Sequence, residues 1–416
     1  MNTAMSDIKE NPLEMHCKYY LRRKKRFCKM TVKKGEEYCG EHQDIDTISS
    51  DKSGKLQRII CPLDKKHTCY AHKLEKHLKI CNARITTVEV YISKGFNLAK
   101  DQNELEEPTS PLSTFLVPQI QKTISKINSF YENFIKDNIS EMVLTHDLVE
   151  SEISAPDCGE NSKKHLRQVS SIVGLMEKYE MMKPNTCYIE FGAGRGQLSY
   201  WIARVTETDE KSKVLLIERA SPKHKKDNKL SNTTDRILRI RADICDIVLD
   251  NLSAISDCEN IVGVTKHLCG EATDIMLRCF ENIKTNRHKI QGCLLTQCCH
   301  HRCKWSSYAG KDLLEEQGFD KNDFDILCGM SSWATCGDGL SREKRKETDP
   351  PLPKQNERDM EMGLSRKDKA EIGRRSKRVI DWGRLLLFKK LGFHCRLHYY
   401  VNTEVSLENV CIVVNR

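Results

Sequence analysis

The 416-residue chain has no run of 18 consecutive apolar residues, and its first residues contain no apolar segment of the kind found in a secretory signal. A membrane-spanning helix needs about 20 mostly apolar residues, and a signal peptide needs an apolar centre of about 7–15. The sequence therefore predicts a soluble intracellular protein, in the nucleus, the cytoplasm or both, without a membrane partner. No internal repeat is visible beyond two dissimilar cysteine-histidine clusters.

Disulfides are also unexpected, although the chain contains 20 cysteines. The cytosol and nucleus keep thiols reduced, so metal binding is the better interpretation of cysteines that lie beside histidines. Hydrophobic residues make up 38% and charged residues 31% of the chain, which is far from the composition of disordered proteins. The length predicts two or three domains and a later part large enough for a sizeable core.

The positive charge is confined to the first quarter of the chain. Residues 1–100 contain 21 lysines and arginines against 12 acidic residues, which accounts for the whole net charge of +9. A concentrated basic region favours nucleic-acid phosphate over a small acidic metabolite as the partner. The alternative is a solvated basic surface with no partner.

A glycine-rich turn follows a short apolar run in the stretch Cys187-Tyr-Ile-Glu-Phe-Gly-Ala-Gly-Arg-Gly-Gln-Leu198. A strand that leads through such a turn into a helix is how doubly wound α/β sheets hold an adenosine cofactor. The spacing of Gly192, Gly194 and Gly196 differs from the G-x-G-x-x-G of nicotinamide enzymes. It resembles the first motif of S-adenosylmethionine-dependent methyltransferases, the alternative being an ordinary tight turn.

Short apolar runs alternate with helical patterns from about residue 163 onward. This alternation is typical of a parallel sheet with helices on both faces, so we predict an α/β fold with a Rossmann-like sheet at residues 160–416. The resemblance of the glycine turn to the methyltransferase motif implies that this is a class I methyltransferase sheet. The predicted strands are 187–191, 214–218, 237–242, 260–265 and 292–297, with a closing hairpin of 395–401 and 409–414. The predicted helices are 119–148, 163–180, 198–205 and 365–391, the last with Gly392 as a C-cap.

The remaining segments differ in composition from the predicted sheet. Residues 84–150 contain acidic and proline-rich stretches, and we interpret them as a linker and helical segment. Residues 337–375 are charged and contain three prolines, which predicts a loop or insertion. Residues 13–44 and 58–83 are compact cysteine-histidine clusters, which predicts two zinc-binding modules.

The second module has the spacing C-x5-H-x9-H-x3-C, given by Cys61, His67, His77 and Cys81. Two thiolates and two imidazoles suit a tetrahedral structural zinc, and the last two ligands are four residues apart, on one face of a predicted helix. This order resembles the CHHC fingers of certain spliceosomal and tRNA-methylating proteins. Cys69 and His72 fall outside the pattern.

The first module has the spacing C-x10-C-x10-C-x2-H, given by Cys17, Cys28, Cys39 and His42. Its first loop contains five consecutive basic residues, 22–26, and a metal that fixes this loop lowers the cost of ordering it against phosphate. The module resembles a CCCH knot that precedes the CHHC finger in one tRNA methyltransferase family. His16 is interpreted as a neighbour of the ligands, and a bipartite localisation signal is the alternative interpretation of the basic run.

Three carboxylates lie at the ends of predicted strands. Glu218 follows an apolar run 22 residues after Gly196, where doubly wound folds place the group that binds the ribose hydroxyls of the cofactor. Asp243 ends the next predicted strand and could contact the adenine amine. Glu190 is expected to brace the glycine turn or to bind the methionine end through water. A surface carboxylate is the simple alternative for Glu218 and Asp243.

Two further segments, Lys266-His-Leu-Cys-Gly270 and Cys298-Cys-His-His-Arg-Cys303, end the fourth and fifth predicted strands. Both should open onto the crevice at the carboxyl edge of the sheet. A donor and an acceptor of a methyl group would meet in this crevice. If the acceptor is a hydroxyl, as the family resemblance of the whole set of motifs implies, methylation needs an aligned acceptor and a group that takes its proton. On that basis we predict Lys266 or His267 as base or positioning group, and an acceptor pocket shaped by His300, His301 and Arg302. A third zinc site within 298–303 is the competing interpretation.

These motifs, together with Met330-Ser-Ser-Trp-Ala-Thr-Cys336, occur in an order that resembles the eukaryotic tRNA 2′-O-methyltransferase family acting on nucleotide four of the acceptor stem. The resemblance covers nearly all of residues 15–415. It implies a methyltransferase fold, S-adenosylmethionine, two structural zinc ions and a ribose hydroxyl of tRNA as acceptor, with no obligate protein partner evident. The Lys-Asp-Lys-Glu tetrad of many ribose methyltransferases cannot be assigned, which leaves the identity of the base open.

Two other functional classes stay open from the sequence. A non-catalytic RNA-binding or spliceosomal adaptor with a degenerate methyltransferase fold would explain the fingers, but the intact glycine turn, Glu218 and Asp243 argue against decay. A base or protein N-methyltransferase would carry an acidic or Asn-Pro-Pro-Tyr-like motif after the fourth strand, where this chain has Lys266-His-Leu-Cys.

Overall fold

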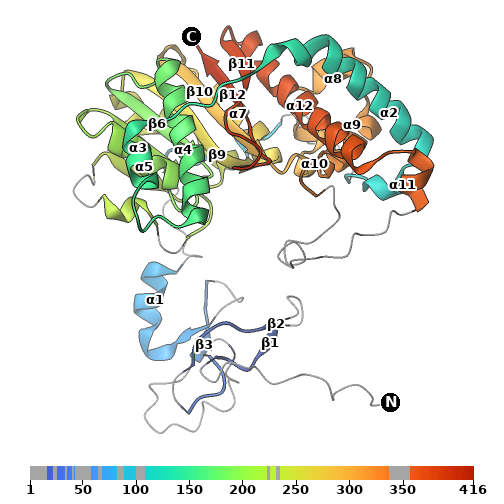
Figure 1. Cartoon of the computed structure of the whole chain (residues 1–416). Coiled ribbons are helices and arrows are strands. Elements are labelled where there is room, and N and C mark those ends of the chain that lie inside the picture. The colour runs from blue at the N-terminus through green and yellow to red at the C-terminus, as the bar shows by residue number, and fades with distance from the viewer. Residues whose placement is uncertain are drawn as a thin grey trace, which may run out of the picture. The chain divides into compact units, whose positions relative to one another are not determined.

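The computed structural model describes residues 16–21, 26–32, 35–39, 42, 58–63, 68–81, 89–99, 108–222, 225–230, 235–336 and 357–416. The chain forms two compact units, Met1–Glu89 and Val90–Arg416. In Figure 1, the described part of the first unit contains small strands and the short helix α1, whereas the second unit contains a sheet covered by helices.

The first unit is organised by short antiparallel hairpins. β1 (Tyr20–Leu21) pairs with β2 (Arg26–Phe27), β3 (Arg58–Ile60) pairs with β4 (Thr68–Tyr70), and α1 (Leu74–Ile80) follows. Among the described residues around β1 and β2, the apolar cluster consists of the buried Cys17, Cys28 and Cys39 with the partly buried Val32 packed against them. An apolar core this small does not hold a fold by itself, so the stability of this module depends on what its thiols bind.

An eight-stranded sheet forms the centre of the second unit, in the order β5-β11-β12-β10-β9-β6-β7-β8. The run from β10 to β8 is parallel, and β12 is antiparallel to both of its neighbours, β10 and β11. The strand order reverses between β6 and β9, and such a switch point is where open α/β sheets bind ligands at the carboxyl ends of the strands. The strands are β5 (Ile139–Glu141), β6 (Thr186–Phe191), β7 (Lys213–Ile217), β8 (Ile237–Ile240), β9 (Asn260–Cys269), β10 (Ile290–Cys298), β11 (His394–Tyr399) and β12 (Val410–Asn415).

Helices cover both faces of this sheet (Figure 1). Successive residues of β9 point to opposite faces, so that Ile261 joins one apolar cluster and Val262 the other, as the two-residue period of a strand requires. Within the described residues, none of the helices combines the length and apolar character needed to cross a bilayer. The helices are α2 (Val117–Phe130), α3 (Asp147–Ile153), α4 (Glu160–Lys178), α5 (Gln197–Val205), α6 (Ser253–Asp257), α7 (Glu271–Glu281), α8 (Lys311–Glu316), α9 (Lys321–Ser331), α10 (Trp333–Cys336), α11 (Glu357–Met362) and α12 (Arg366–Lys390).

The predicted α/β fold is confirmed, and every predicted strand has a counterpart in the sheet. The predicted helix 119–148 is wrong in its second half. α2 ends at Phe130 and a π-helical turn (Tyr131–Ile135) follows, because Ile139 then pairs with Leu397 at the edge of the sheet. Within the predicted loop 337–375, α11 is a helix that the sequence did not predict, and residues 337–356 are outside the described residues. The predicted helix 365–391 is confirmed as α12.

Residues 90–150 belong to the second unit, although the sequence predicted a linker and helical segment there. β5 extends the sheet beyond β11, and Ile92 forms a bridge with Ile247. The amide of Asn97, which is fully buried, donates hydrogen bonds of 2.9 and 2.7 Å to the carbonyls of Ile244 and Ile247. These long-range contacts cannot be read from local composition, which is why the segment resembles a linker in the sequence.

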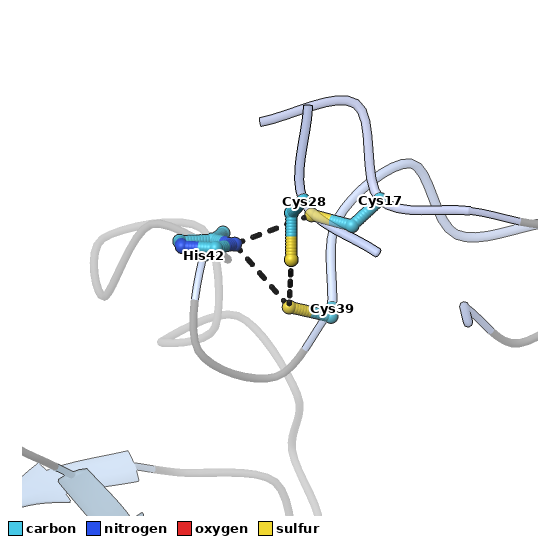
Figure 2. A group of neighbouring side chains, drawn as sticks. All are labelled: Cys17, Cys28, Cys39 and His42. Atoms are coloured by element: carbon cyan, nitrogen blue, oxygen red, sulfur yellow. Dashed lines mark hydrogen bonds between the residues drawn. The ribbon is translucent and has the colours of Figure 1, made fainter. Parts of the chain in front are cut away.

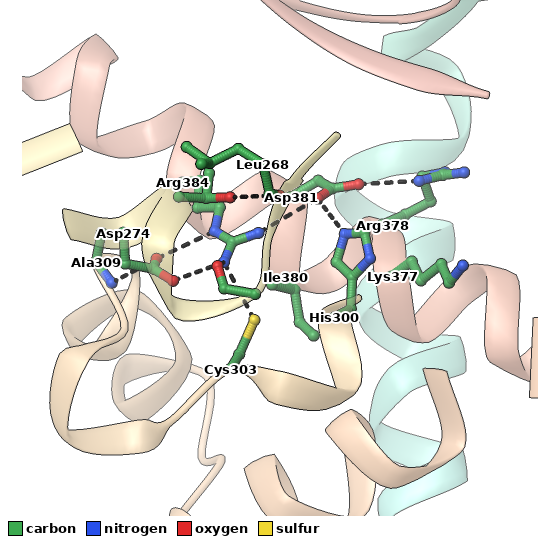
Figure 3. Close-up of polar contacts among 12 residues, drawn as sticks. Leu268, Asp274, His300, Cys303, Ala309, Lys377, Arg378, Ile380, Asp381 and Arg384 are labelled. Carbon is green, nitrogen blue, oxygen red and sulfur yellow. Dashed lines mark hydrogen bonds and ion pairs between the residues drawn. The ribbon is translucent and has the colours of Figure 1, made fainter. Parts of the chain in front are cut away.

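A buried ion network anchors α12 to the loops at the carboxyl edge of the sheet (Figure 3). The Arg384 guanidinium is fully buried and donates to Asp274 at 2.6 and 3.1 Å and to the Gly270 carbonyl at 3.1 Å. It also lies 3.1 Å from the Cys303 sulfur. A buried charge of this kind must keep its partners, because an uncompensated ion in the interior is very costly. The network therefore fixes the segments that follow β9 and β10.

We predict that Asp274→Ala lowers the free energy of unfolding by about 3–5 kcal/mol, because Arg384 stays buried without its carboxylate. Urea unfolding followed by circular dichroism measures this change. The control is Lys136→Ala, which removes an exposed ion pair with Glu132 and should change the stability little. Equal decreases in stability for the two variants would contradict the importance given to the buried network.

Candidate active site and metal centres

The side chains of Cys17, Cys28, Cys39 and His42 are arranged like the ligands of a metal site (Figure 2). The Nδ1 atom of His42 lies 3.4 Å from the Cys17 sulfur and 3.3 Å from the Cys39 sulfur, and the sulfurs of Cys28 and Cys39 are 4.0 Å apart. A tetrahedral zinc with bonds of about 2.3 Å to sulfur and 2.0 Å to nitrogen requires separations close to these. Tyr19 stacks on the His42 ring at a centroid distance of 4.0 Å, which fixes the orientation of that ligand.

The second cluster brings together three of its four predicted ligands. The sulfurs of Cys61 and Cys81 are 3.7 Å apart, and His77 Nε2 lies 3.2 Å from the Cys61 sulfur. The predicted ligand His67 lies outside the described residues. His77 is on α1 and Cys81 follows the last residue of that helix, so the two ligands come from one helical end, as the spacing predicted. Cys69 and His72 are not members of the group.

The glycine turn lies between β6 and α5 at the switch point of the sheet. Gly192, Gly194 and Gly196 all have positive φ, at 67°, 51° and 71°. A Cβ at Gly196 would approach a Leu216 methyl to 2.7 Å and an oxygen of Asp227 to 2.8 Å, so only glycine fits this left-handed N-cap of α5. The turn therefore exposes backbone rather than side chains at the helix start, where a nucleoside ligand can approach closely.

The three predicted carboxylates occupy different environments. The Glu218 carboxylate accepts from the amides of Gly194 at 2.9 Å and Ala220 at 2.7 Å, so it holds the turn while remaining half-exposed. Asp243 pairs with Arg219 at 3.0 Å. Burial opposes its ionisation, but hydrogen bonds from Cys245 and Arg219 lower the pKa of Asp243 below its ordinary value.

Glu190 is buried beneath the glycine turn. Its carboxylate accepts hydrogen bonds from both the amide and the hydroxyl of Ser199 in α5. Burial raises the pKa of Glu190 to about 7, against the effect of the two Ser199 bonds. Glu190 thus braces the turn against α5, which is one of the two roles predicted for it.

A β-bulge re-aims the side chains at the carboxyl end of β9. Lys266 is aligned with Thr296 of β10, but the next β10 residue is aligned with Leu268, so that His267 is extra and has a φ of 65°. A bulge bends the strand locally and is common beside active sites. Sequence patterns cannot reveal this extra residue, because it is defined only by pairing with β10.

The bulge directs Lys266 and His267 toward α4. The Lys266 amine lies 3.5 Å from Nδ1 of His165, and His267 Nε2 lies 2.8 Å from the Gln168 side-chain oxygen. Burial lowers the pKa of Lys266 to about 8, although the Glu190 carboxylate opposes the shift. Burial and the Lys266 charge lower the pKa of His267 to about 4. At neutral pH, the site therefore offers a neutral imidazole and an amine that is easily deprotonated.

The predicted acceptor-pocket residues separate into two groups. His301 and Arg302 are exposed, whereas His300 is only 2% exposed and its Nε2 lies 2.7 Å from Asp381 (Figure 3). Burial opposes ionisation of Asp381, but His300, Arg378 and Arg384 hold its pKa at about 2. His300 is thus held inside the protein against Asp381, and its predicted part in shaping the acceptor pocket stays a prediction.

Sequence reasoning missed four polar residues of this site. His165 and Gln168 are three residues apart on the predicted helix 163–180, and this spacing on one helical face was the available signal. Ser199 follows the glycine turn. Among the described residues, Gln297 at the end of β10 is 2% exposed, and neither its side-chain oxygen nor its nitrogen has a hydrogen-bond partner. Such an unsatisfied amide is costly, so it marks a position where a ligand can supply the missing partners.

Comparison with known proteins agrees with this arrangement. Residues 167–415 match the family Methyltransferase TRM13, residues 15–43 match the CCCH zinc finger in TRM13 protein, and residues 58–82 match the U11-48K-like CHHC zinc finger. The chain is 31% identical to the tRNA:m(4)X modification enzyme TRM13 homolog of Mus musculus, over 96% of this chain and 94% of that protein. It is 29% identical to the tRNA:m(4)X modification enzyme TRM13 of Yarrowia lipolytica, over 97% and 90%.

Similarity to solved structures is much weaker. The plantazolicin methyltransferase BpumL in complex with SAH is 9% identical and has a TM-score of 0.29, over 72% of this chain and 97% of that one. That relationship is too distant to support a functional argument.

We predict that Cys39→Ser lowers the zinc content of the purified protein by about one ion per chain, because the CCCH cluster then has only two of its three thiolates. Inductively coupled plasma mass spectrometry measures the change. The control is His16→Ala, next to the ligand Cys17 but outside the group, which should leave the zinc content unchanged. A decrease in zinc in the control alone would mean that the ligand set has been assigned wrongly.

Proposed function

The chain belongs to the TRM13 methyltransferase family, and we propose that it methylates the ribose 2′-hydroxyl of nucleotide four in the acceptor stem of tRNA. S-adenosylmethionine would supply an electrophilic methyl group. The proposal rests mainly on one observation. The glycine turn and Lys266, whose pKa is about 8, lie at the same switch point of the sheet. We also propose an intracellular location, nuclear or cytoplasmic, which is where tRNA is processed and used.

The residues around the turn suit an adenosine-containing donor. The amides of the turn and the half-exposed Glu218 carboxylate can bind ribose hydroxyls, as the acid after the second strand does in doubly wound folds. Asp243 lies at the end of the next strand and could contact the adenine amine. Among the described residues, one backbone amide donates to each Glu218 oxygen, which leaves further lone pairs for ribose hydroxyls.

Lys266 is the proposed base. A ribose hydroxyl is a weak acid, so attack by its oxygen on a methyl group is helped by a nearby amine that takes the proton. The side chain is half-buried and faces Glu190 and His165, which keeps it positioned. His267, which is neutral and hydrogen-bonded to Gln168, can position the acceptor hydroxyl. The exposed His301 and Arg302 can contact the RNA backbone nearby.

The principal test is methyl transfer from a labelled donor to total tRNA, followed by mapping of the labelled nucleotide. A 2′-O-methyl group makes the following phosphodiester resistant to alkali, so we expect one alkali-resistant dinucleotide derived from position four. Label in a base, in protein, or at another ribose would contradict the proposal. Binding of the donor to the protein without any transfer would favour a non-catalytic RNA-binding adaptor.

We predict that Lys266→Ala lowers the single-turnover methylation rate by about 100-fold or more, the usual range for removal of a positioned base. In the wild-type protein, the rate should rise with pH and level off above about pH 8, because the amine must be deprotonated to accept the hydroxyl proton. The exposed Lys136→Ala variant is the matched control. A full rate in Lys266→Ala, or an unchanged pH profile, would remove Lys266 as the base.

We predict that glutamine at all five basic positions 22–26 weakens tRNA binding and flattens its salt dependence. The slope of log affinity against log salt should decrease by about 0.7–0.9 for each phosphate that the loop no longer neutralises. Filter binding at several salt concentrations measures both quantities. The control replaces Lys284 and Arg287, which precede the amino end of β10, and should leave the slope unchanged. An unchanged slope in the five-residue variant would exclude the loop as a phosphate-binding element.

A further inference from the structure

In addition to the cysteines of the two zinc modules, three cysteines lie close together at the carboxyl edge of the sheet. Cys269 ends β9 and is exposed, Cys298 ends β10 and is buried, and Cys299 follows and is half-buried. Their sulfur atoms all lie within 4.8 Å of one another. The sulfurs of Cys269 and Cys298 are 3.2 Å apart. No role in the proposed methyl transfer requires these three thiols.

The backbone is distorted at two places to bring these cysteines together. The bulge at His267 shifts the register of β9, so that Cys269 lies directly opposite Cys298 in β10. Consecutive residues of a strand normally point to opposite faces, but Cys299 has a φ of 55°, in the left-handed region. This turn allows both Cys298 and Cys299 to face Cys269. Positive φ at non-glycine residues is costly and tends to be retained at functional sites.

The cluster resembles the two zinc modules in the spacing of its donor atoms. In those modules, neighbouring sulfurs are 4.0 and 3.7 Å apart, which brackets the spacing around a tetrahedral zinc. Cys269 and Cys298 are slightly closer, and an increase of about 0.5 Å would bring them to that spacing. The ligands come from two strands, so the crowding expected of a site confined to residues 298–303 does not arise.

Other candidate ligands nearby are already engaged. The Cys303 sulfur contacts Arg384, and His300 contacts Asp381. In the part of the chain that the structure describes, the group contains three ligands and no fourth. Because Cys269 is exposed, a fourth position would be open to solvent. Three protein ligands with an open position are typical of reactive rather than purely structural zinc sites.

We propose that Cys269, Cys298 and Cys299 form a third metal site, which binds Zn²⁺ through three thiolates with water in the fourth position. Thiolates select zinc over harder divalent cations. Binding releases the thiol protons to solvent. The ion ties the end of β9 to the end of β10, three residues after Lys266, and so holds the segment in which the proposed base lies. The proposal concerns metal binding and does not depend on the identity of the methyl acceptor.

The test is the zinc content of the full-length protein, purified with reductant and zinc but without chelator. We expect about three ions per chain in the wild type and about two in Cys269→Ser, which replaces an exposed thiol. Cys158→Ser, a half-buried cysteine outside every group, is the matched control and should retain three. Two ions in the wild type, or no difference between the wild type and Cys269→Ser, would overturn the proposal.

A second measurement is needed because incomplete loading of the zinc fingers would also lower the zinc content. Cobalt(II) replaces zinc in such sites, and its thiolate charge-transfer absorption reports the number of bound sulfurs. We expect the absorption to decrease in both Cys269→Ser and Cys298→Ser and to be unchanged in Cys158→Ser. A disulfide between Cys269 and Cys298 is the main rival. It would lower the number of free thiols in the unreduced wild type by two. The cobalt absorption would then be the same in the wild type, Cys269→Ser and Cys298→Ser, and that result would contradict the proposal.

Discussion

The parallel pairing of β6 with β9 is the constraint on which the candidate site depends. Glu190 is aligned with Val264 across this pair, so the glycine turn after β6 and the Lys266–His267 bulge after Val264 leave the sheet side by side. The contact is so close that a Cβ at Gly192 would lie 2.8 Å from a Leu268 methyl. The chain runs from β6 to β7 and β8 on one side and returns to β9 on the other side of β6, so this pair is the switch point of the sheet. The two halves of the site meet there because the sheet topology allows it.

Much of this arrangement could be predicted from the sequence, because apolar runs and glycine spacing are local signals. Such local signals predicted the strands, the glycine turn, Glu218 and both cysteine-histidine modules. The rest depends on contacts between distant segments. The extra residue at His267 exists only relative to Thr296 and its neighbours in β10. Likewise, His300 is buried against Asp381, 81 residues away in the sequence, and no local pattern reveals that contact.

The two units stabilise their loops in different ways. The described part of the CCCH module has almost no apolar side chains around its cysteines, so its shape depends on a bound ion. The second unit has a large core and holds its loops by buried charge, with Arg384 reaching both Asp274 and the Gly270 carbonyl. A metal-dependent module can order a basic loop with few residues. A buried ion network, by contrast, fixes loop positions at the cost of desolvating several charges.

The position of β12 has a consequence for synthesis on the ribosome. This strand comes after all the others in the sequence, yet it lies between β10 and β11 and pairs with both along most of its length. β10 (Ile290–Cys298) is synthesised well before β12 (Val410–Asn415), so the edge of β10 that β12 covers is open in the meantime. An open strand edge can pair with other chains. Closure of the sheet around β12 is therefore a late event in folding.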